Sequence, residues 1–193
     1  MLKIGITGNI GSGKTTVCRI FEHLGVEVYY SDARAKQFYQ DSTVKQQIKN
    51  HFGESVFDAE EKVSTSKLAA LVFKNAEALQ TLNNLIHPLV IADFMRWCEQ
   101  RKTQKIVLFE SAIIYPCGLE NLFDRIILVD APLDKLLQRT AQRDNVDMEV
   151  VKQRLSFQQA TPHHSYQADF IIINDEKSSL LQEVVRIYAL LNI

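Results

Sequence analysis

The sequence has little of several features that would commit a chain to a particular environment. Its three cysteines, among 193 residues, have no paired spacing and no C-x-x-C, which argues against a disulfide framework and favours a reducing compartment. No apolar run approaches the length of a membrane span, and a net charge of −1 creates no overall field for nucleic acid or acidic membranes. A core strand is predicted to begin at residue 2, which leaves no room for a signal peptide. We therefore expect a cytoplasmic protein that binds neither nucleic acid nor membranes.

The strongest local pattern is a phosphate-binding loop between a predicted strand, residues 2–7, and a predicted helix that starts near Gly13 and stops at Gly25. Residues 8–15, GNIGSGKT, match G-x-x-x-x-G-K-[ST] without a gap, in the strand–loop–helix context that this motif requires. Glycines permit close backbone approach, so inward N–H groups and the helix N-terminus can bind a triphosphate. The alternative is an ordinary glycine-rich turn, which would not need a strand, the complete motif and a helix in direct succession. The residues predicted to bind the triphosphate are Gly8, Asn9, Ile10, Gly11, Ser12, Gly13, Lys14, Thr15 and Thr16.

Three side chains around this loop have a predicted chemical role. Lys14 can reach the β- and γ-phosphates as a point charge, and the hydroxyl of Thr15 is placed to bind Mg²⁺. Glu110 ends an apolar strand, residues 105–110, which is typical of a Walker B carboxylate that binds Mg²⁺, often through water, or orients a partner. The alternative is that Glu110 is a strand-end acid facing solvent. The loop predicts phosphate binding but does not identify the group that receives the phosphate.

Asp32 follows another short predicted strand, residues 26–30. In open α/β sheets the functional residues lie just past the carboxyl ends of the strands, and Asp32 is in such a position. Ser31 or Asp32 could equally cap a helix predicted over residues 33–39. The sequence does not distinguish these two interpretations.

Residues 32–103 differ from the rest of the chain because strand signals disappear and polar helix formers dominate. Helices are predicted over residues 43–52, 66–73, 76–86 and 89–101. His87-Pro88 interrupts the last two, and since proline suits the first turn of a helix, we expect His87 at a helix start. A histidine at a helix boundary without a chemical role is the alternative. An insertion of this length in a nucleotide-binding core is predicted to bind the second substrate.

Three arginines are predicted to lie on a helical hairpin near the end of the chain. Arg139 and Arg143 are four residues apart on a predicted helix, residues 132–143, and Arg154 lies on the next, residues 147–159. Arginine pairs well with phosphate oxygens, so residues 138–164 could form a lid that closes over a nucleotide. A solvated basic surface is the alternative. His163 and His164 have no companion metal ligands and are interpreted as loop residues.

The overall pattern predicts an α/β fold. Five apolar runs alternate with helices, which favours a parallel sheet covered on both faces, in the three-layer arrangement of P-loop NTPases. The expected nucleotide-binding core is discontinuous, residues 1–31 and 104–193, and residues 32–103 form the helical insertion. The remaining predicted elements of the core are strands 124–130 and 168–173 and a final amphipathic helix, 177–191.

The order and spacing of several segments resemble the dephospho-coenzyme A kinase family over nearly the whole chain. The segments that carry this resemblance are IGITGNIGSGKTT, VYYSDARAK, LIHPLV, VLFESAII, FDRIILVDAP, LLQRTAQRD, RLSFQQ and ADFIIIND. The resemblance implies transfer of the γ-phosphoryl group of ATP, with Mg²⁺, to the ribose 3′-hydroxyl of dephospho-CoA, the final step of coenzyme A synthesis.

The resemblance also implies residue roles. Asp32 matches the family's general base, and His87-Pro88 match the His-Pro pair of its coenzyme A-binding region. Asn174 lies where the family is expected to bind the adenine of ATP. The lid arginines match Arg139, Arg143 and Arg154. We therefore expect catalysis by Asp32, Lys14 and Arg139, ATP binding by the loop with Arg143 and Asn174, and acceptor binding by Asp32, His87, Pro88, Glu110 and Arg154.

The chain departs from the family pattern at three places. Ser31 occupies a position where the family commonly has an aspartate, and Lys36 occupies the position of the family's next arginine. Residues 112–116 lack the glutamate that is usual in the family. All three lie on the acceptor side rather than in the phosphate loop.

Two other functional classes also bind a nucleotide through a loop of this kind. Another small-molecule kinase, acting on nucleosides or nucleoside monophosphates, would carry a similar loop and lid, although the long insertion favours a bulkier acceptor. A nucleotide switch would carry Asp-x-x-Gly and Asn-Lys-x-Asp, and neither occurs in the sequence. We expect a monomer or a weak homo-oligomer.

Overall fold

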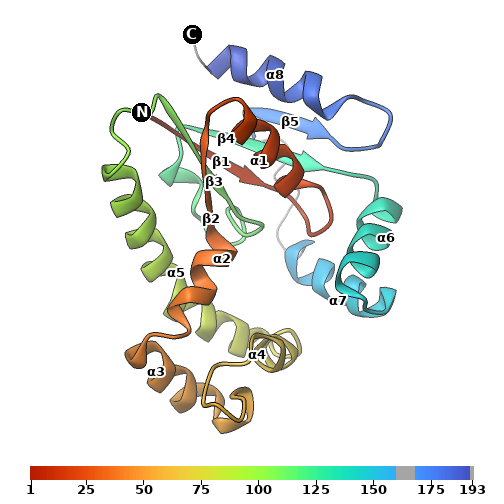
Figure 1. Cartoon of the computed structure of the whole chain (residues 1–193). Coiled ribbons are helices and arrows are strands. Elements are labelled where there is room, and N and C mark those ends of the chain that lie inside the picture. The colour runs from red at the N-terminus through yellow and green to blue at the C-terminus, as the bar shows by residue number, and fades with distance from the viewer. Residues whose placement is uncertain (160–167, 192–193) are drawn as a thin grey trace. The chain divides into compact units, whose positions relative to one another are not determined.

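The fold is built on one parallel sheet. The computed structural model describes residues 1–159 and 168–191. Five strands pair in the order β2-β3-β1-β4-β5, all parallel, so every strand ends at the same edge of the sheet (Figure 1). The strands are β1 Leu2–Thr7, β2 Glu27–Tyr30, β3 Ile106–Glu110, β4 Arg125–Asp130 and β5 Phe170–Ile173. This confirms the predicted α/β class with a five-stranded parallel sheet.

The chain divides into two compact units, Met1–Tyr30 with Arg101–Ile193, and Ser31–Gln100. The first unit contains the sheet. Its helices are α1 Lys14–His23, η2 Glu120–Leu122, α6 Leu133–Asp144, α7 Met148–Gln159 and α8 Leu180–Leu191. The second unit contains the helices α2 Ser31–Phe38, α3 Ser42–Phe52, η1 Glu54–Val56, α4 Thr65–Val72 and α5 Ala76–Glu99.

In the first unit, helices α1 and α8 pack on one face of the sheet around a fully apolar core. Side chains that alternate along the strands, such as Ile4 and Ile6 of β1, point toward these helices and are completely buried. Gly5 lies between them and faces the opposite side, where Ile114 and Phe123 cover the sheet. A Cβ on Gly5 would lie 2.8 Å from Ile114 Cδ1 and 3.0 Å from Phe123 Cδ2, so glycine allows this second layer to pack closely on β1.

The second unit is helical, and its helices begin at side-chain caps. The carboxylate of Asp41 accepts hydrogen bonds from the backbone N–H groups of Thr43 and Val44, 2.9 and 3.1 Å away, at the start of α3. Asn75 caps α5 in the same way. Asp41 and Asn75 therefore define where these helices begin. Among residues 1–159 and 168–191, no helix is both long and apolar enough to cross a membrane.

Helix α5 differs from the prediction. The sequence predicted two helices, 76–86 and 89–101, with His87 at the start of the second, but α5 runs unbroken from Ala76 to Glu99 with Pro88 in its interior. The reason is burial along one continuous face, which outweighs the cost of a proline that cannot donate to the helix. The buried side chains of this face are Leu82, Ile86, Val90, Phe94, Trp97 and Cys98.

Replacing Pro88 with alanine should raise the free energy of unfolding by about 1–3 kcal/mol, because a backbone donor returns to the helix interior and the ring no longer crowds the preceding turn. Urea unfolding monitored by circular dichroism measures the change. Ala92→Pro, one turn further along the same helix, is the matched control and should lower stability by about 3 kcal/mol. A Pro88→Ala protein less stable than the wild type would contradict this account of α5.

Candidate active site

The loop between β1 and α1 has the backbone of a phosphate-binding loop. Gly8 and Gly11 adopt φ angles of 142° and 81°, which L side chains rarely adopt. A Cβ on Gly8 would lie 2.0 Å from the carbonyl oxygen of Val129, and one on Gly11 would lie 2.5 Å from Thr140 Oγ1. Both glycines are therefore required by conformation and by space.

Lys14 is the first residue of α1, and its side chain folds back over the loop. Its ammonium group donates to the carbonyl oxygens of Gly8 and Asn9, at 2.9 and 3.2 Å, and the residue is only 8% exposed. The N–H of Ser12 donates to the carbonyl of Asn9 at 3.1 Å and tightens the same turn. A buried cation thus lies against the loop that the sequence predicted to bind phosphate, close to where an anion would be neutralised.

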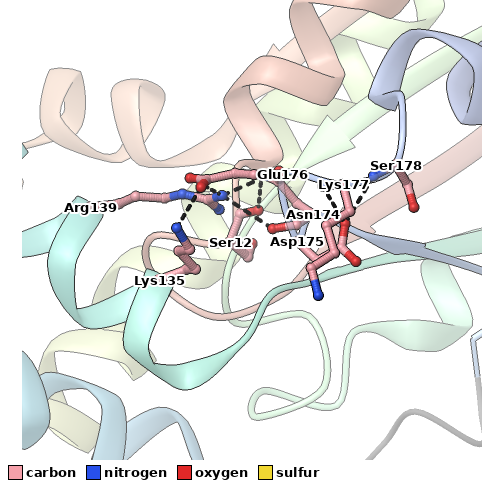
Figure 2. A network of polar contacts seen from close by, with 8 residues as sticks. All are labelled: Ser12, Lys135, Arg139, Asn174, Asp175, Glu176, Lys177 and Ser178. Atoms are coloured by element: carbon pink, nitrogen blue, oxygen red, sulfur yellow. Dashed lines mark hydrogen bonds and ion pairs between the residues drawn. The ribbon is translucent and has the colours of Figure 1, made fainter.

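A polar network connects the loop to α6 and to the segment after β5 (Figure 2). Asn174 donates from Nδ2 to the carbonyl oxygen of Ser12 at 2.8 Å. Arg139 of α6 donates from Nη2 to the carbonyl oxygen of Asn174 at 3.2 Å and to Glu176 Oε1 at 2.9 Å. Lys135 donates to the other oxygen of Glu176 at 2.5 Å. Two residues predicted from the sequence, Arg139 and Asn174, are thus brought together at the loop.

Sequence reasoning missed Lys135 and Glu176. Neither belongs to a motif, and the contact between them spans 41 residues of sequence, so only the folded chain reveals it. Both partners pull the pKa of Glu176 below its usual value, with the hydrogen bond from Lys135 as the larger cause and that from Arg139 next. The carboxylate is therefore held ionised beside the arginine that we predicted to be catalytic.

The other two predicted lid arginines share a different carboxylate. Arg143 Nε lies 2.8 Å from Asp144 Oδ1, and Arg154 Nη1 lies 2.8 Å from Asp144 Oδ2. The hydrogen bond from Arg143 is the largest cause of a lowered pKa at Asp144. Because Arg143 and Asp144 both lie on α6 and Arg154 lies on α7, the pair of Arg154 with Asp144 connects the two helices. Residues 160–164 of the predicted lid, with His163 and His164, lie outside the described residues.

Glu110 lies at the carboxyl end of β3, in register with Ile6 of β1 and Tyr30 of β2. It is 8% exposed, which does not fit the alternative of a solvent-facing acid. Burial raises the pKa of the Cys18 thiol on α1, the Glu110 carboxylate raises it further, and Lys14 opposes them. The pairing of Glu110 with Ile6, and the hydrogen bond from the Ser111 N–H to the Ile6 carbonyl at 3.0 Å, place Glu110 beside the end of β1, where the phosphate loop begins.

In the second unit, Asp32 lies in the first turn of α2, two residues after β2 ends at Tyr30. Because the helix begins at Ser31, Asp32 lies inside it and the capping interpretation of this residue is wrong. Burial lowers the pKa of His87, which the Asp32 carboxylate opposes, and burial raises the pKa of Tyr39 with a further contribution from Asp32. Asp32 thus has His87 and Tyr39 as neighbours. Tyr39 carried no sequence signal.

The strand order and the loop after β1 define the class of the protein. A parallel sheet of this order, with a Walker A loop leading into α1, is the arrangement of P-loop kinases. The family model described as dephospho-CoA kinase matches residues 2–179. A dephospho-CoA kinase of Bacteroides fragilis (strain YCH46) is 34% identical over 191 residues, which cover 98% of this chain and 93% of that protein.

Two solved structures are also similar to this chain over nearly its whole length. The crystal structure of TT1252 from Thermus thermophilus has a TM-score of 0.81 at 28% identity and covers 98% of this chain and 96% of that one. The dephospho-CoA kinase from Campylobacter jejuni has a TM-score of 0.66 at 26% identity, and the match covers 97% of this chain and 95% of that one. The chain belongs to the dephospho-CoA kinase family. It is therefore a transferase of coenzyme A biosynthesis that uses ATP.

Proposed function

We propose that this chain transfers the γ-phosphoryl group of ATP to the ribose 3′-hydroxyl of dephospho-CoA, giving coenzyme A and ADP, with Asp32 as general base. The observation that carries this proposal is a complete phosphate loop with Lys14 folded over it. It occurs in a chain that the family model matches over residues 2–179. Another P-loop small-molecule kinase would share the loop but not the family match. The reaction is the final step of coenzyme A biosynthesis.

The phosphoryl donor is bound by groups of the first unit. The loop N–H groups and the α1 N-terminus hold the phosphates, and Lys14 and Arg139 neutralise the charge that develops on the γ-phosphoryl oxygens. Asn174, bonded to the loop at Ser12, contacts the adenine, and Arg143 adds a further cation on the same helix as Arg139. The loop geometry and the network that joins it to α6 support these roles.

The donor atoms near the loop fit Mg²⁺. The side chain of Thr15 is exposed at the start of α1, and the Glu110 carboxylate lies at the end of the neighbouring strand. Hydroxyl and carboxylate oxygens are the ligands that this hard cation prefers, so Thr15 would hold it directly and Glu110 through water. When bound, Mg²⁺ neutralises charge on the β- and γ-phosphate oxygens.

The acceptor is bound by residues of the predicted helical insertion, 32–103, together with Arg154 and Glu110. Asp32 accepts the proton of the 3′-hydroxyl as the bond from that oxygen to the γ-phosphorus forms and the bond from phosphorus to the ADP oxygen breaks. His87 and Pro88 contact dephospho-CoA, and residues 138–164 close over ATP as a lid. The position of Asp32 just after β2, and its neighbour His87, support this assignment. A cytoplasmic location and a monomeric or weakly oligomeric state stay predictions.

The test is a transfer assay with ATP, Mg²⁺ and dephospho-CoA, with the product identified by mass and by the position of the new phosphate. One phosphoryl group added at the ribose 3′-hydroxyl is the expected result. Nucleosides and nucleoside monophosphates, assayed as acceptors with ADP release as the readout, are the comparison. Faster transfer to one of these than to dephospho-CoA would overturn the proposal and favour the alternative kinase.

A further inference from the structure

Three buried polar atoms beside the phosphate loop have no hydrogen-bond partner within the described part of the chain. They are Ser12 Oγ, Thr140 Oγ1 and one guanidinium nitrogen, Nη1, of Arg139. Ser12 and Thr140 are completely buried. Burying a hydroxyl without a partner destabilises a protein, so such groups are rare and need an explanation. Ser12 and Arg139 already have proposed roles toward ATP, which leaves Thr140.

Thr140 lies on α6 and faces the backbone of the loop. A Cβ on Gly11 would lie 2.5 Å from Thr140 Oγ1 and 2.6 Å from the carbonyl oxygen of Leu136, so α6 packs directly on Gly11. The neighbouring Leu136 belongs to an apolar cluster with Val151 and Leu155. Valine has the shape of threonine and would suit such surroundings better. Packing therefore does not explain why a hydroxyl is present.

Phosphate binding supplies the partner that the hydroxyl lacks. In a trans peptide the N–H and the C=O point in opposite directions. When the N–H groups of residues 11 and 12 turn toward bound phosphate, that of Ser12 giving up its bond to the Asn9 carbonyl, the carbonyl groups of residues 10 and 11 turn away from the phosphate. Helix α6 packs on the loop at Gly11. Thr140 Oγ1 is the donor that faces this side of the loop.

We propose that Thr140 is a positioning residue for the nucleotide: its hydroxyl donates to a loop carbonyl at Ile10 or Gly11 when ATP or ADP is bound, and so stabilises the phosphate-binding conformation of the loop. This inference rests on the proposed function, because it assigns the loop to nucleotide binding. It gives α6 a role beyond its arginines, since the helix supports the loop backbone directly.

The inference predicts opposite effects on the free and the bound protein. Thr140→Val should leave the melting temperature of the nucleotide-free protein unchanged or higher, because it removes a buried hydroxyl without a partner. The same change should weaken ADP binding about tenfold, the loss expected for one hydrogen bond made only in the complex. Thr140→Ser keeps the hydroxyl and should bind ADP nearly as the wild type does. Isothermal titration with ADP and thermal unfolding, with and without ADP, measure both effects.

The control is Thr81→Val, the same change on α5, where the hydroxyl donates to the Glu77 carbonyl at 2.9 Å. It should leave ADP affinity unchanged. If Thr140→Val does not fold, Thr140→Ser and Thr140→Ala provide the same comparison, and serine should bind ADP about tenfold more tightly than alanine.

A Thr140→Val protein that melts lower but binds ADP normally would show a merely structural residue and overturn the inference. Wild-type protein that does not bind ADP would instead overturn the proposed function of the loop, so the two failures are distinguishable.

Discussion

Replacing Asp32 with asparagine should lower turnover of ATP and dephospho-CoA by about 10²–10⁴-fold and leave the affinity for ATP nearly unchanged. Asparagine has nearly the size of aspartate and keeps one acceptor oxygen, so the position of the acceptor is largely preserved. The carboxylate that takes the proton of the 3′-hydroxyl is lost. Turnover at saturating substrates and ADP binding by titration separate the two effects.

The stability of this variant should change little. Asp32 lies in the first turn of α2, where a carboxylate interacts favourably with the helix dipole by only about 0.3–1 kcal/mol. A large loss of turnover with a small loss of stability would therefore identify a chemical role rather than a structural one.

Asp41→Asn provides the matched control, because Asp41 caps α3 in the same unit and asparagine caps a helix as well as aspartate does. It should keep normal turnover. Wild-type turnover in Asp32→Asn would exclude Asp32 as the general base and direct attention to His87 and Tyr39, the neighbours that the structure gives it.

The sequence predicted the phosphate loop and the sheet because their signals are local. The loop is contiguous from Gly8 to Thr15, and its glycines and Lys14 occupy fixed positions in the motif. Strand ends are equally local, which is why Glu110 could be placed at the end of β3. In these cases a few consecutive residues are enough to predict the element, and the structure adds its distances and angles.

Predictions from the sequence were wrong or missing where the structure depends on packing between distant segments. Pro88 indicated a helix break, but the buried face of α5 overrides that local preference. The partners of the arginines were equally hidden: Glu176 lies 37 residues from Arg139, and only the fold brings them together. Thr140 belongs to no motif, and its proposed role follows from its buried hydroxyl without a partner and from its closeness to Gly11. Functional roles of residues that act through other residues therefore need the structure.

Replacing Lys14 with methionine should lower turnover by about 10²–10³-fold, because it removes a preorganised cation from the place where charge develops on the γ-phosphoryl oxygens. The loss should fall on turnover more than on ADP affinity, since the loop N–H groups and the α1 N-terminus still bind the phosphates. Single-turnover transfer and ADP titration separate the two quantities.

Lys14→Arg tests why a lysine is required. The ammonium group contacts the carbonyl oxygens of Gly8 and Asn9 in a position only 8% exposed, and a planar guanidinium is larger and donates in a fixed fork. This variant keeps the charge but should stay well below wild-type turnover. Lys102→Met, at an exposed lysine of the same unit, is the matched control and should be fully active. Wild-type activity in Lys14→Met would mean that the loop backbone alone stabilises the transferring phosphoryl group, and the role of Lys14 would reduce to holding the carbonyl groups of Gly8 and Asn9.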